Sequence, residues 1–344
     1  MIQSLFNKLL IWQRERKMSD YRFIQLDVFT DKSFTGNPLA VFPEAEGLTD
    51  EQMMQIAREM NLSETVFVLT PEATKEVHTT AADEIGSKPS VLRRLRIFTP
   101  TREIPFAGHP VVGTWNGLAR EGVVPLPQGG TGWQRIYHEV GIGILPVDIE
   151  FREGQPVQVV MTQGEFKIID EIDDSHEQAE LARALGLARE DLDESLPIQT
   201  ISTGLTCLAV PIRSLADLRD CKVNSSLLAE IYTRRGGSGC HAFTRETIDV
   251  GASRAHARFF APADNIAEDP ATGSACGALG AYLVYHDGLS VEPDNGHVKF
   301  VIEQGDFMHR PSRISLNVKG SKGAIEEVKV GGPSVLVAKG TVMV

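Results

Sequence analysis

RIFTPTREIPFAGHPVVGT, Arg96 to Thr114, and RFFAPADNIAEDPATGSACGA, Arg258 to Ala278, are two stretches that resemble each other. Phe98, Pro100 and Ile104 align with Phe260, Pro262 and Ile266 without a gap, and Gly113 aligns with Gly277 after two inserted residues. Each copy is typical of a strand, a proline-containing turn, a glycine-rich loop and the start of a helix. Two such units predict two similar lobes that face each other across a cleft, and the cleft is the first place to look for chemistry.

A second pair of stretches supports a duplication. FTGNPLAVFP, residues 34–43, resembles STGLTCLAVP, residues 202–211, with one residue inserted. Repeat arrays have periods of about 20–50 residues, so this longer offset indicates duplicated domains and not a solenoid. We expect an N-terminal lobe over residues 18–150 and a C-terminal lobe over 151–329. The last strand, about 330–344, is expected to return to the first lobe.

The composition is that of a globular protein whose 344 residues are enough for two cores. Hydrophobic residues make up 42% of the chain and charged residues 23%. The net charge of −12 argues against a nucleic-acid partner, because phosphate binding needs clustered Lys and Arg. Local donors can still hold a small anionic metabolite. No run of about 18 apolar residues exists, so we expect no membrane-spanning helix.

The four cysteines are scattered, without a C-x-x-C pair, which is typical of a reduced, cytoplasmic protein. A structural zinc site needs clustered Cys and His ligands, and Cys240-His241 is the nearest approach. We therefore expect no metal. The first 17 residues, MIQSLFNKLLIWQRERK, form a separate N-terminal extension whose positive charge follows its apolar run, unlike a secretory signal. A basic amphipathic helix at a membrane surface is the alternative to a passive extension.

Short β-rich runs dominate the rest of the chain. Helices are expected at Thr49 to Met60, Ser175 to Gly186 and Leu215 to Leu218, and Thr49 with Gln52 has the spacing of a capping box. The expected strands are FIQLDVF, AVFP, TVFVL, RLRIF, ILPVDIEF, VQVVMT, CLAVPI, ARFFA, VKFVIEQ, RISLNV and VLVAKGTV.

The helices that follow the two duplicated loops matter most. In the first, Pro110 suits the first helical position and places His109 at or beside the N-cap. The second is expected over about 275–286, with Ser274 as its N-cap. Both are rich in Gly and Ala, which suits helices wrapped closely by strands. The free N–H groups at each start are suited to hold a carboxylate or an enolate oxygen.

Four segments together resemble the PhzF-like family of phenazine-biosynthesis isomerases, which is similar in fold to diaminopimelate epimerase. They are NLSETVFVL, RIFTPTREIPFAGHPVVGT, DPATGSACGALGAYL and EQGDFMHRPS, and the resemblance runs from Tyr21 to the C-terminus. It implies an α+β fold of two pseudo-symmetric lobes, each a β-barrel-like sheet around a central helix. It also implies a homodimer and an isomerase that needs no cofactor.

The resemblance assigns catalytic roles to Glu64, His109 and Asp269, with Glu64 as the acid/base. Ser274, Gly108 and Gly273 are then expected to bind a substrate carboxylate. A single carboxylate can move a proton between two carbons of one substrate if partial burial raises its pKa. The residues alone leave simpler roles open: Glu64 as a solvated turn residue, His109 and Ser274 as helix caps, and Asp269 as a turn opener.

Two alternative functions stay open from the sequence. Cys276, in SACGA, resembles one of the two cysteines of epimerases of this fold, but no cysteine lies near the first helix. A cysteine-assisted epimerase or racemase therefore needs a second base, and a packed thiol is the simpler interpretation. A non-catalytic small-molecule-binding protein of the same fold is the other alternative. Arg310, in HRPS, either binds an anion or braces a loop, and we expect bracing.

Overall fold

In the computed structural model, residues 19–72 and 91–344 are described, and they form a mixed α+β fold. Their strands hydrogen-bond into one 18-stranded sheet with a few helices beside it. The expected α+β class is therefore confirmed, and the predicted extension, residues 1–17, lies outside the described residues. In the described ranges no helix is long and apolar enough to span a membrane.

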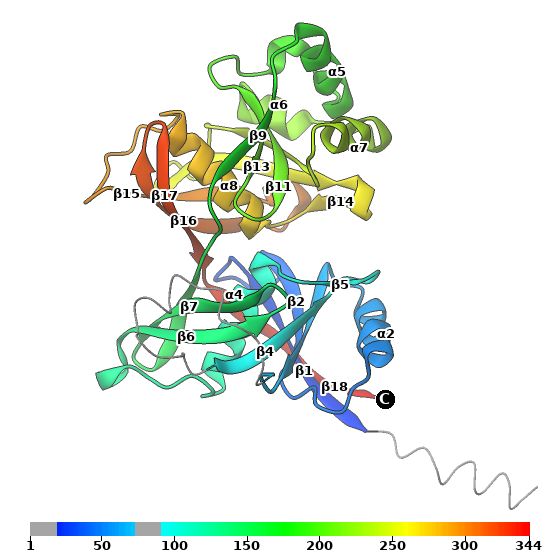
Figure 1. Ribbon diagram of the computed structural model, residues 1–344, viewed down its shortest axis with the longest axis vertical. Coiled ribbons are helices and arrows are strands. Elements are labelled where there is room, and N and C mark those ends of the chain that lie inside the picture. Colours follow the sequence, from blue (N-terminus) through cyan, green and yellow to red (C-terminus); the bar gives the residue numbers. More distant parts are fainter. Residues whose placement is uncertain (1–18, 73–90) are drawn as a thin grey trace, which may run out of the picture.

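One group of strands lies around the helix α4, Gly108–Arg120, in the lower part of Figure 1. Five of these strands contact α4 directly: β1, β2, β3, β8 and β18. The group contains β1 (Asp20–Val28), β2 (Asn37–Phe42), β3 (Glu64–Leu69), β4 (Val91–Phe98), β5 (Glu103–Ile104), β6 (Gly132–Val140), β7 (Gly143–Arg152), β8 (Gln155–Thr162) and β18 (Ser334–Met343).

A second group lies around the helix α8, Gly273–Tyr285, in the upper part of Figure 1. Here β10, β11, β15, β16 and β17 contact the helix. The group contains β9 (Lys167–Ile172), β10 (Ile198–Ser202), β11 (Thr206–Pro211), β12 (Cys240–Thr244), β13 (Ser253–Ala261), β14 (Ile266–Asp269), β15 (His297–Gln304), β16 (Ser312–Ser321) and β17 (Ala324–Gly332).

The two groups repeat one order of strand pairing. β1–β2 and β10–β11 are antiparallel, whereas β2–β3 and β11–β12 are parallel. β4–β6 and β13–β15 are parallel in the same way. In each group the antiparallel pair gains a further antiparallel partner: β18, from the end of the chain, pairs with β1, and β9, which directly precedes β10 in strand order, pairs with β10. β8 and β17 pair with each other and join the groups.

Both central helices are buried on all sides, which requires small residues. In α4, 12 of 13 residues are buried, and in α8, 11 of 13. A Cβ on Gly113 would lie 2.6 Å from the Val28 side chain and 2.7 Å from that of Leu39. A glycine in a helix costs about 1 kcal/mol relative to alanine. Here the glycine is still favoured, because its missing side chain allows β1 and β2 to approach the α4 backbone.

The outer helices are α2 (Asp50–Met60), α5 (Ser175–Leu185), α6 (Leu215–Asp220) and α7 (Ser225–Arg234). The capping box of Thr49 and Gln52 at the start of α2 is confirmed. Gly186 ends α5 in the left-handed conformation, at φ 76°. α7 was not expected from the sequence, although Asn224 caps it by accepting a hydrogen bond from the Leu227 N–H.

Two expectations about the central helices are wrong. α8 begins at Gly273, so Ser274 lies inside the first turn and is not its N-cap. Thr272 takes that position, but its hydroxyl donates to Asp269 and caps no helical amide. Pro110 is the third residue of α4 and not the first, and Ala107 is the N-cap. Both positions still fall in a first turn, where the backbone N–H groups have no partner inside the helix.

Candidate active site

The starts of α4 and α8 meet, and their first residues define the site. A Cβ on Gly108 would lie 3.2 Å from the backbone nitrogen of Ser274, so the two glycine-led turns are almost in contact. On the other helix, a Cβ on Gly273 would lie 2.8 Å from the ring of Phe29. A side chain at Gly108 would therefore separate the two turns, and a side chain at Gly273 would displace Phe29. Two sets of free helical N–H groups converge here, which favours a bound anion.

Glu64 is the first residue of β3 and pairs with Leu39 of the parallel strand β2. Its side chain is 12% exposed, and its Oε2 lies 3.2 Å from Nε2 of His109, whose side chain is 6% exposed. Neither atom has a hydrogen-bond partner among the described residues, because the angles between the two groups are unfavourable. Buried polar atoms are almost always satisfied in native proteins, so both atoms of this pair are available to a polar group of a ligand.

Burial sets the charges of this pair. It raises the pKa of Glu64 to about 8, and the nearby Asp269 raises it further in the same direction. It lowers the pKa of His109 to about 3. Near neutral pH a carboxylic acid therefore faces a neutral imidazole, and the 3.2 Å contact is not an ion pair. An acid whose pKa lies near the working pH can both give and take a proton.

Asp269 ends β14 and is buried on the other side of the site. Its Oδ2 accepts a hydrogen bond from Thr272 Oγ1 at 2.5 Å, and its Oδ1 accepts one from Asn37 Nδ2 at 3.0 Å. Burial raises the pKa of Asp269, and these two donors oppose that rise. The aspartate does hold the turn before α8, but it is also linked to the residues around His109.

Three buried or half-buried amide and hydroxyl residues complete this network and were not singled out from the sequence: Asn37, Thr272 and Gln304. Asn37 Nδ2 lies 3.3 Å from His109 Nδ1 and 2.9 Å from the carbonyl oxygen of Ala271. Gln304 donates to the Asp269 carbonyl at 2.7 Å and accepts from the Thr272 N–H at 3.2 Å. All three lie in quoted motifs, TGNP, DPATGSA and EQGDF, and their polarity beside apolar strands was the available signal.

Ser274 lies in the first turn of α8 and is half-buried. Its carbonyl accepts a 3.5 Å hydrogen bond from Thr203, while the described residues offer its hydroxyl no partner. The hydroxyl and the adjacent N–H groups are thus available to a ligand. The structure brings Glu64, His109 and Asp269 together and places Gly108, Gly273 and Ser274 where the helices meet.

Cys276 lies in the buried helix α8, away from solvent. The residue is fully buried, and its Sγ lies 3.4 Å from Oε1 of Gln304. Burial raises the pKa of this thiol well above its ordinary value, which keeps it protonated. Within residues 19–72 and 91–344, no three Cys, His, Asp or Glu side chains are grouped as metal ligands.

Arg310 braces the loop that carries Asn37, as expected. Its guanidinium donates to the carbonyl of Gly36 at 2.7 Å and to that of Thr35 at 2.8 Å. It also donates to Oδ1 of Asp27 at 2.7 Å. With three protein acceptors satisfied, Arg310 is a structural element and not the anion receptor.

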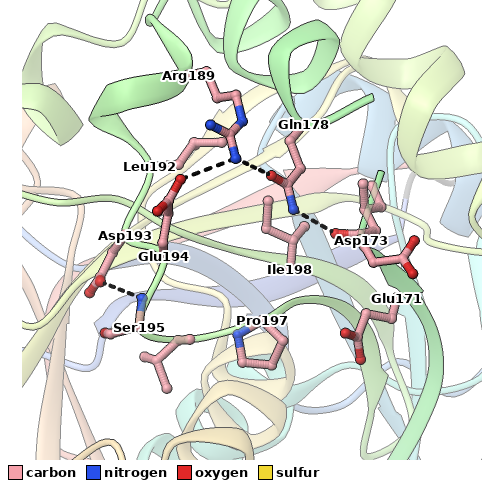
Figure 2. Close-up of a pocket in the computed structure, with 12 residues that line it drawn as sticks. Glu171, Asp173, Gln178, Arg189, Leu192, Asp193, Glu194, Ser195, Pro197 and Ile198 are labelled. Carbon is pink, nitrogen blue, oxygen red and sulfur yellow. Dashed lines mark hydrogen bonds and ion pairs between the residues drawn. The ribbon is translucent and has the colours of Figure 1, made fainter. Parts of the chain in front are cut away.

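A separate hollow of about 470 Å³ lies between α5, β9 and the start of β10, away from these residues (Figure 2). In it Arg189 donates to Gln178 at 3.2 Å and pairs with Glu194 at 3.1 Å. The other charged groups of its wall are carboxylates, so the hollow does not suit an anion. None of the six expected site residues lines it.

The family model described as phenazine biosynthesis-like protein matches residues 26–340. The chain belongs to this family. An uncharacterized isomerase of Clostridium acetobutylicum is 36% identical, over 93% of this chain and 97% of that protein. Trans-2,3-dihydro-3-hydroxyanthranilate isomerase of Pseudomonas aeruginosa is 31% identical, over 93% of this chain and 98% of that protein.

Solved structures agree with this assignment. A PhzF family protein of Bacillus anthracis matches with a TM-score of 0.78 at 29% identity, over 95% of this chain and 100% of that one. A probable proline racemase from Agrobacterium radiobacter matches at 12% identity with a TM-score of 0.58, which shows a shared fold. The predicted PhzF family is thus confirmed, and this member is an enzyme, an isomerase.

Proposed function

We propose that this PhzF family member is a cofactor-independent isomerase that moves a proton within a small carboxylate-bearing metabolite. Glu64 is the proton shuttle. The observation that carries the proposal is the unsatisfied Glu64–His109 pair, 3.2 Å apart, beside the two meeting helix starts. The relatives from Pseudomonas support the substrate class, because an anthranilate bears a carboxylate.

The two groups of elements act as pseudo-symmetric lobes, each a β-barrel-like sheet around its central helix. The N-terminal lobe comprises residues 18–150, extended by β8, which contacts α4, and by the last strand, about 330–344. The C-terminal lobe, expected over 151–329, then begins after β8. The doubled order of strand pairing supports this division. The substrate cleft lies between the lobes, where Glu64 and His109 come from one and Asp269 and Ser274 from the other.

The chemical step needs one carboxyl group. The step starts from the ionised minority of Glu64 that a pKa of about 8 leaves near neutral pH. This carboxylate removes a proton from one substrate carbon, so a C–H bond breaks and an O–H bond forms. The electron pair of the broken C–H bond is delocalised within the substrate as an enolate-like system. Glu64 then returns the proton to a second carbon. The step is redox-neutral and leaves Glu64 as it began.

The remaining residues bind and stabilise the substrate. The N–H groups of Gly108 and Gly273 and the Ser274 hydroxyl hold the substrate carboxylate through the two helix starts. His109 and Asp269 contact its other polar groups and the displaced charge. Following the family, the enzyme is a homodimer. Four free, buried cysteines support a reducing, cytoplasmic setting.

The test is a screen of small carboxylates in deuterated water with wild type, Glu64→Gln and Cys276→Ala. Glu64→Gln is expected to slow deuterium incorporation by about 10²–10⁴-fold, the range for loss of a general acid/base. Cys276→Ala is expected to retain exchange, because its thiol is neutral and fully buried. Exchange that survives Glu64→Gln and vanishes in Cys276→Ala would overturn the carboxylate mechanism. Light scattering at the monomer mass, 37.7 kDa, would contradict the dimer.

A further inference from the structure

We infer that Asn37 is a positioning residue: it fixes His109 in the tautomer that carries its proton on Nε2, toward Glu64. Asn37 is the first residue of β2 and is fully buried. The importance of this positioning for catalysis rests on the proposed function, but the tautomer of His109 is a property of the resting protein.

The orientation of the Asn37 amide is determined by its surroundings. Nδ2 lies 2.9 Å from the carbonyl oxygen of Ala271, which can only accept a hydrogen bond. It also lies 3.0 Å from Oδ1 of Asp269. A reversed amide would place Oδ1 of Asn37 against both oxygens. The NH2 group must therefore occupy this position, although crystallographic density rarely distinguishes the two ends of an amide.

This orientation determines where His109 carries its proton. The same NH2 group faces Nδ1 of His109 at 3.3 Å, so Nδ1 is the acceptor. A neutral imidazole has one N–H, which must then lie on Nε2. Nε2 is 3.2 Å from Oε2 of Glu64. In the resting protein this N–H lies beside the oxygen without the angles of a hydrogen bond. When Glu64 has given its proton to substrate, the resulting carboxylate attracts the N–H and is stabilised by it.

The charged and titratable groups around the ring are consistent with this assignment. Glu64 of β3 faces Nε2, and Asp269 of β14 reaches Nδ1 only through Asn37. Asn37 has two N–H bonds for three acceptors, and the contact to His109 is the longest. The amide therefore shares a hydrogen between His109 and one of the oxygens. It also connects β2 to the turn before α8, so the state of His109 depends on how the two groups of strands are packed.

The direct test is ¹⁵N NMR of the imidazole rings in the full chain, which has nine histidines. His109→Gln identifies the signals of His109 by their absence. We expect an unprotonated Nδ1 and a protonated Nε2 that remain so from about pH 5 to about pH 9. A protonated Nδ1 in wild type would overturn the inference without any variant.

Asn37→Ala tests the cause of the tautomer. Without the donor, His109 is expected to interconvert between tautomers, which shifts its Nδ1 signal. Deuterium exchange should fall by about 10–100-fold, as when a residue that orients a functional histidine is removed. Asn116→Ala is the matched control, since Asn116 is equally buried and, within the described part of the chain, its side chain accepts only from Arg120, at 2.8 Å. An unchanged His109 spectrum in Asn37→Ala would contradict the inference.

The outcomes separate this inference from the proposed function. If Glu64→Gln keeps full exchange while wild-type His109 shows the Nε2–H tautomer, the proton shuttle is wrong and the role of Asn37 in the ring stands. If Glu64→Gln abolishes exchange while His109 carries its proton on Nδ1, the shuttle stands and the role of Asn37 is wrong.

Discussion

Replacing the proposed proton shuttle should make the protein more stable. Glu64 has a pKa of about 8 in the folded protein against an ordinary value of 4.5, because burial penalises its charge. The folded state therefore holds a proton that the unfolded chain releases near neutral pH. Linkage makes this unfavourable for folding by about 3 kcal/mol at pH 7, since each pKa unit corresponds to about 1.4 kcal/mol. Glu64→Gln removes this penalty, as the amide is neutral at every pH.

The sign and the pH window distinguish this effect from ordinary packing changes. Below about pH 4 both states of wild type are protonated, and the two proteins should differ little. Between about pH 5 and pH 7.5 the advantage of Glu64→Gln should grow by about 1.4 kcal/mol per pH unit, and it should level off above about pH 8. Most active-site substitutions that stabilise a protein reduce its activity, and this one should do both.

Urea unfolding of wild type and Glu64→Gln at several pH values measures this difference. Glu59→Gln, on the exposed side of α2, is the control and should show no pH-dependent gain. A Glu64→Gln protein that is less stable than wild type at pH 7, or whose advantage is independent of pH, would refute the reasoning. Glu64 would then be ionised in the folded state and could not act as an acid near neutral pH.

Three further predictions concern stability and the site. Burial disfavours the charge of Glu303, but the His256 ring and the N–H groups of Ile248 and Asp249 outweigh this and lower its pKa to about 2. Glu303→Gln should therefore lower the free energy of unfolding by about 3 kcal/mol above about pH 4.5. Unfolding measured at decreasing pH should show the difference between variant and wild type closing toward about pH 2. Gly113→Ala should cost about 1–3 kcal/mol in thermal unfolding, because its Cβ meets Val28 at 2.6 Å. Gly288→Ala, with contacts no closer than 3.4 Å, should be nearly neutral, and equal losses in both would contradict the packing argument. Arg310→Lys should lower the free energy of unfolding in urea by about 2 kcal/mol and slow deuterium exchange, since an ammonium cannot reach Gly36, Thr35 and Asp27 together. Unchanged exchange would show that the loop held by Arg310 does not affect the site.

The sequence predicted the family and the central helices because their signals are local. Glycine-rich loops, proline and alternating strands leave patterns within about ten residues. The starts of the helices were placed less well. Ser274 looked like a cap, but the Asp269–Thr272 hydrogen bond draws the preceding turn into a different shape. A cap depends on which backbone amide a side chain reaches, and composition does not contain that information.

Asn37 shows why part of the site could not be predicted. Its partners, His109, Asp269 and Ala271, are 72, 232 and 234 residues away in the chain. Nothing around Asn37 in the sequence indicates that its amide will meet them. Strands such as β6 and β17 were missed for a related reason. Their polar residues look unsuited to a sheet until the neighbouring strands that cover them are known.

The pairing of β1 with β18 bears on how the molecule is assembled during synthesis. β1 leaves the ribosome early, but its partner is made only after every element between Val28 and Ser334. Until then one edge of β1 has unpaired backbone groups, and such edges recruit other strands. A nascent chain must therefore protect this edge throughout translation. We expect ribosome-bound chains that stop before Ser334 to depend on chaperones, whereas the completed sheet closes the edge with its own strand.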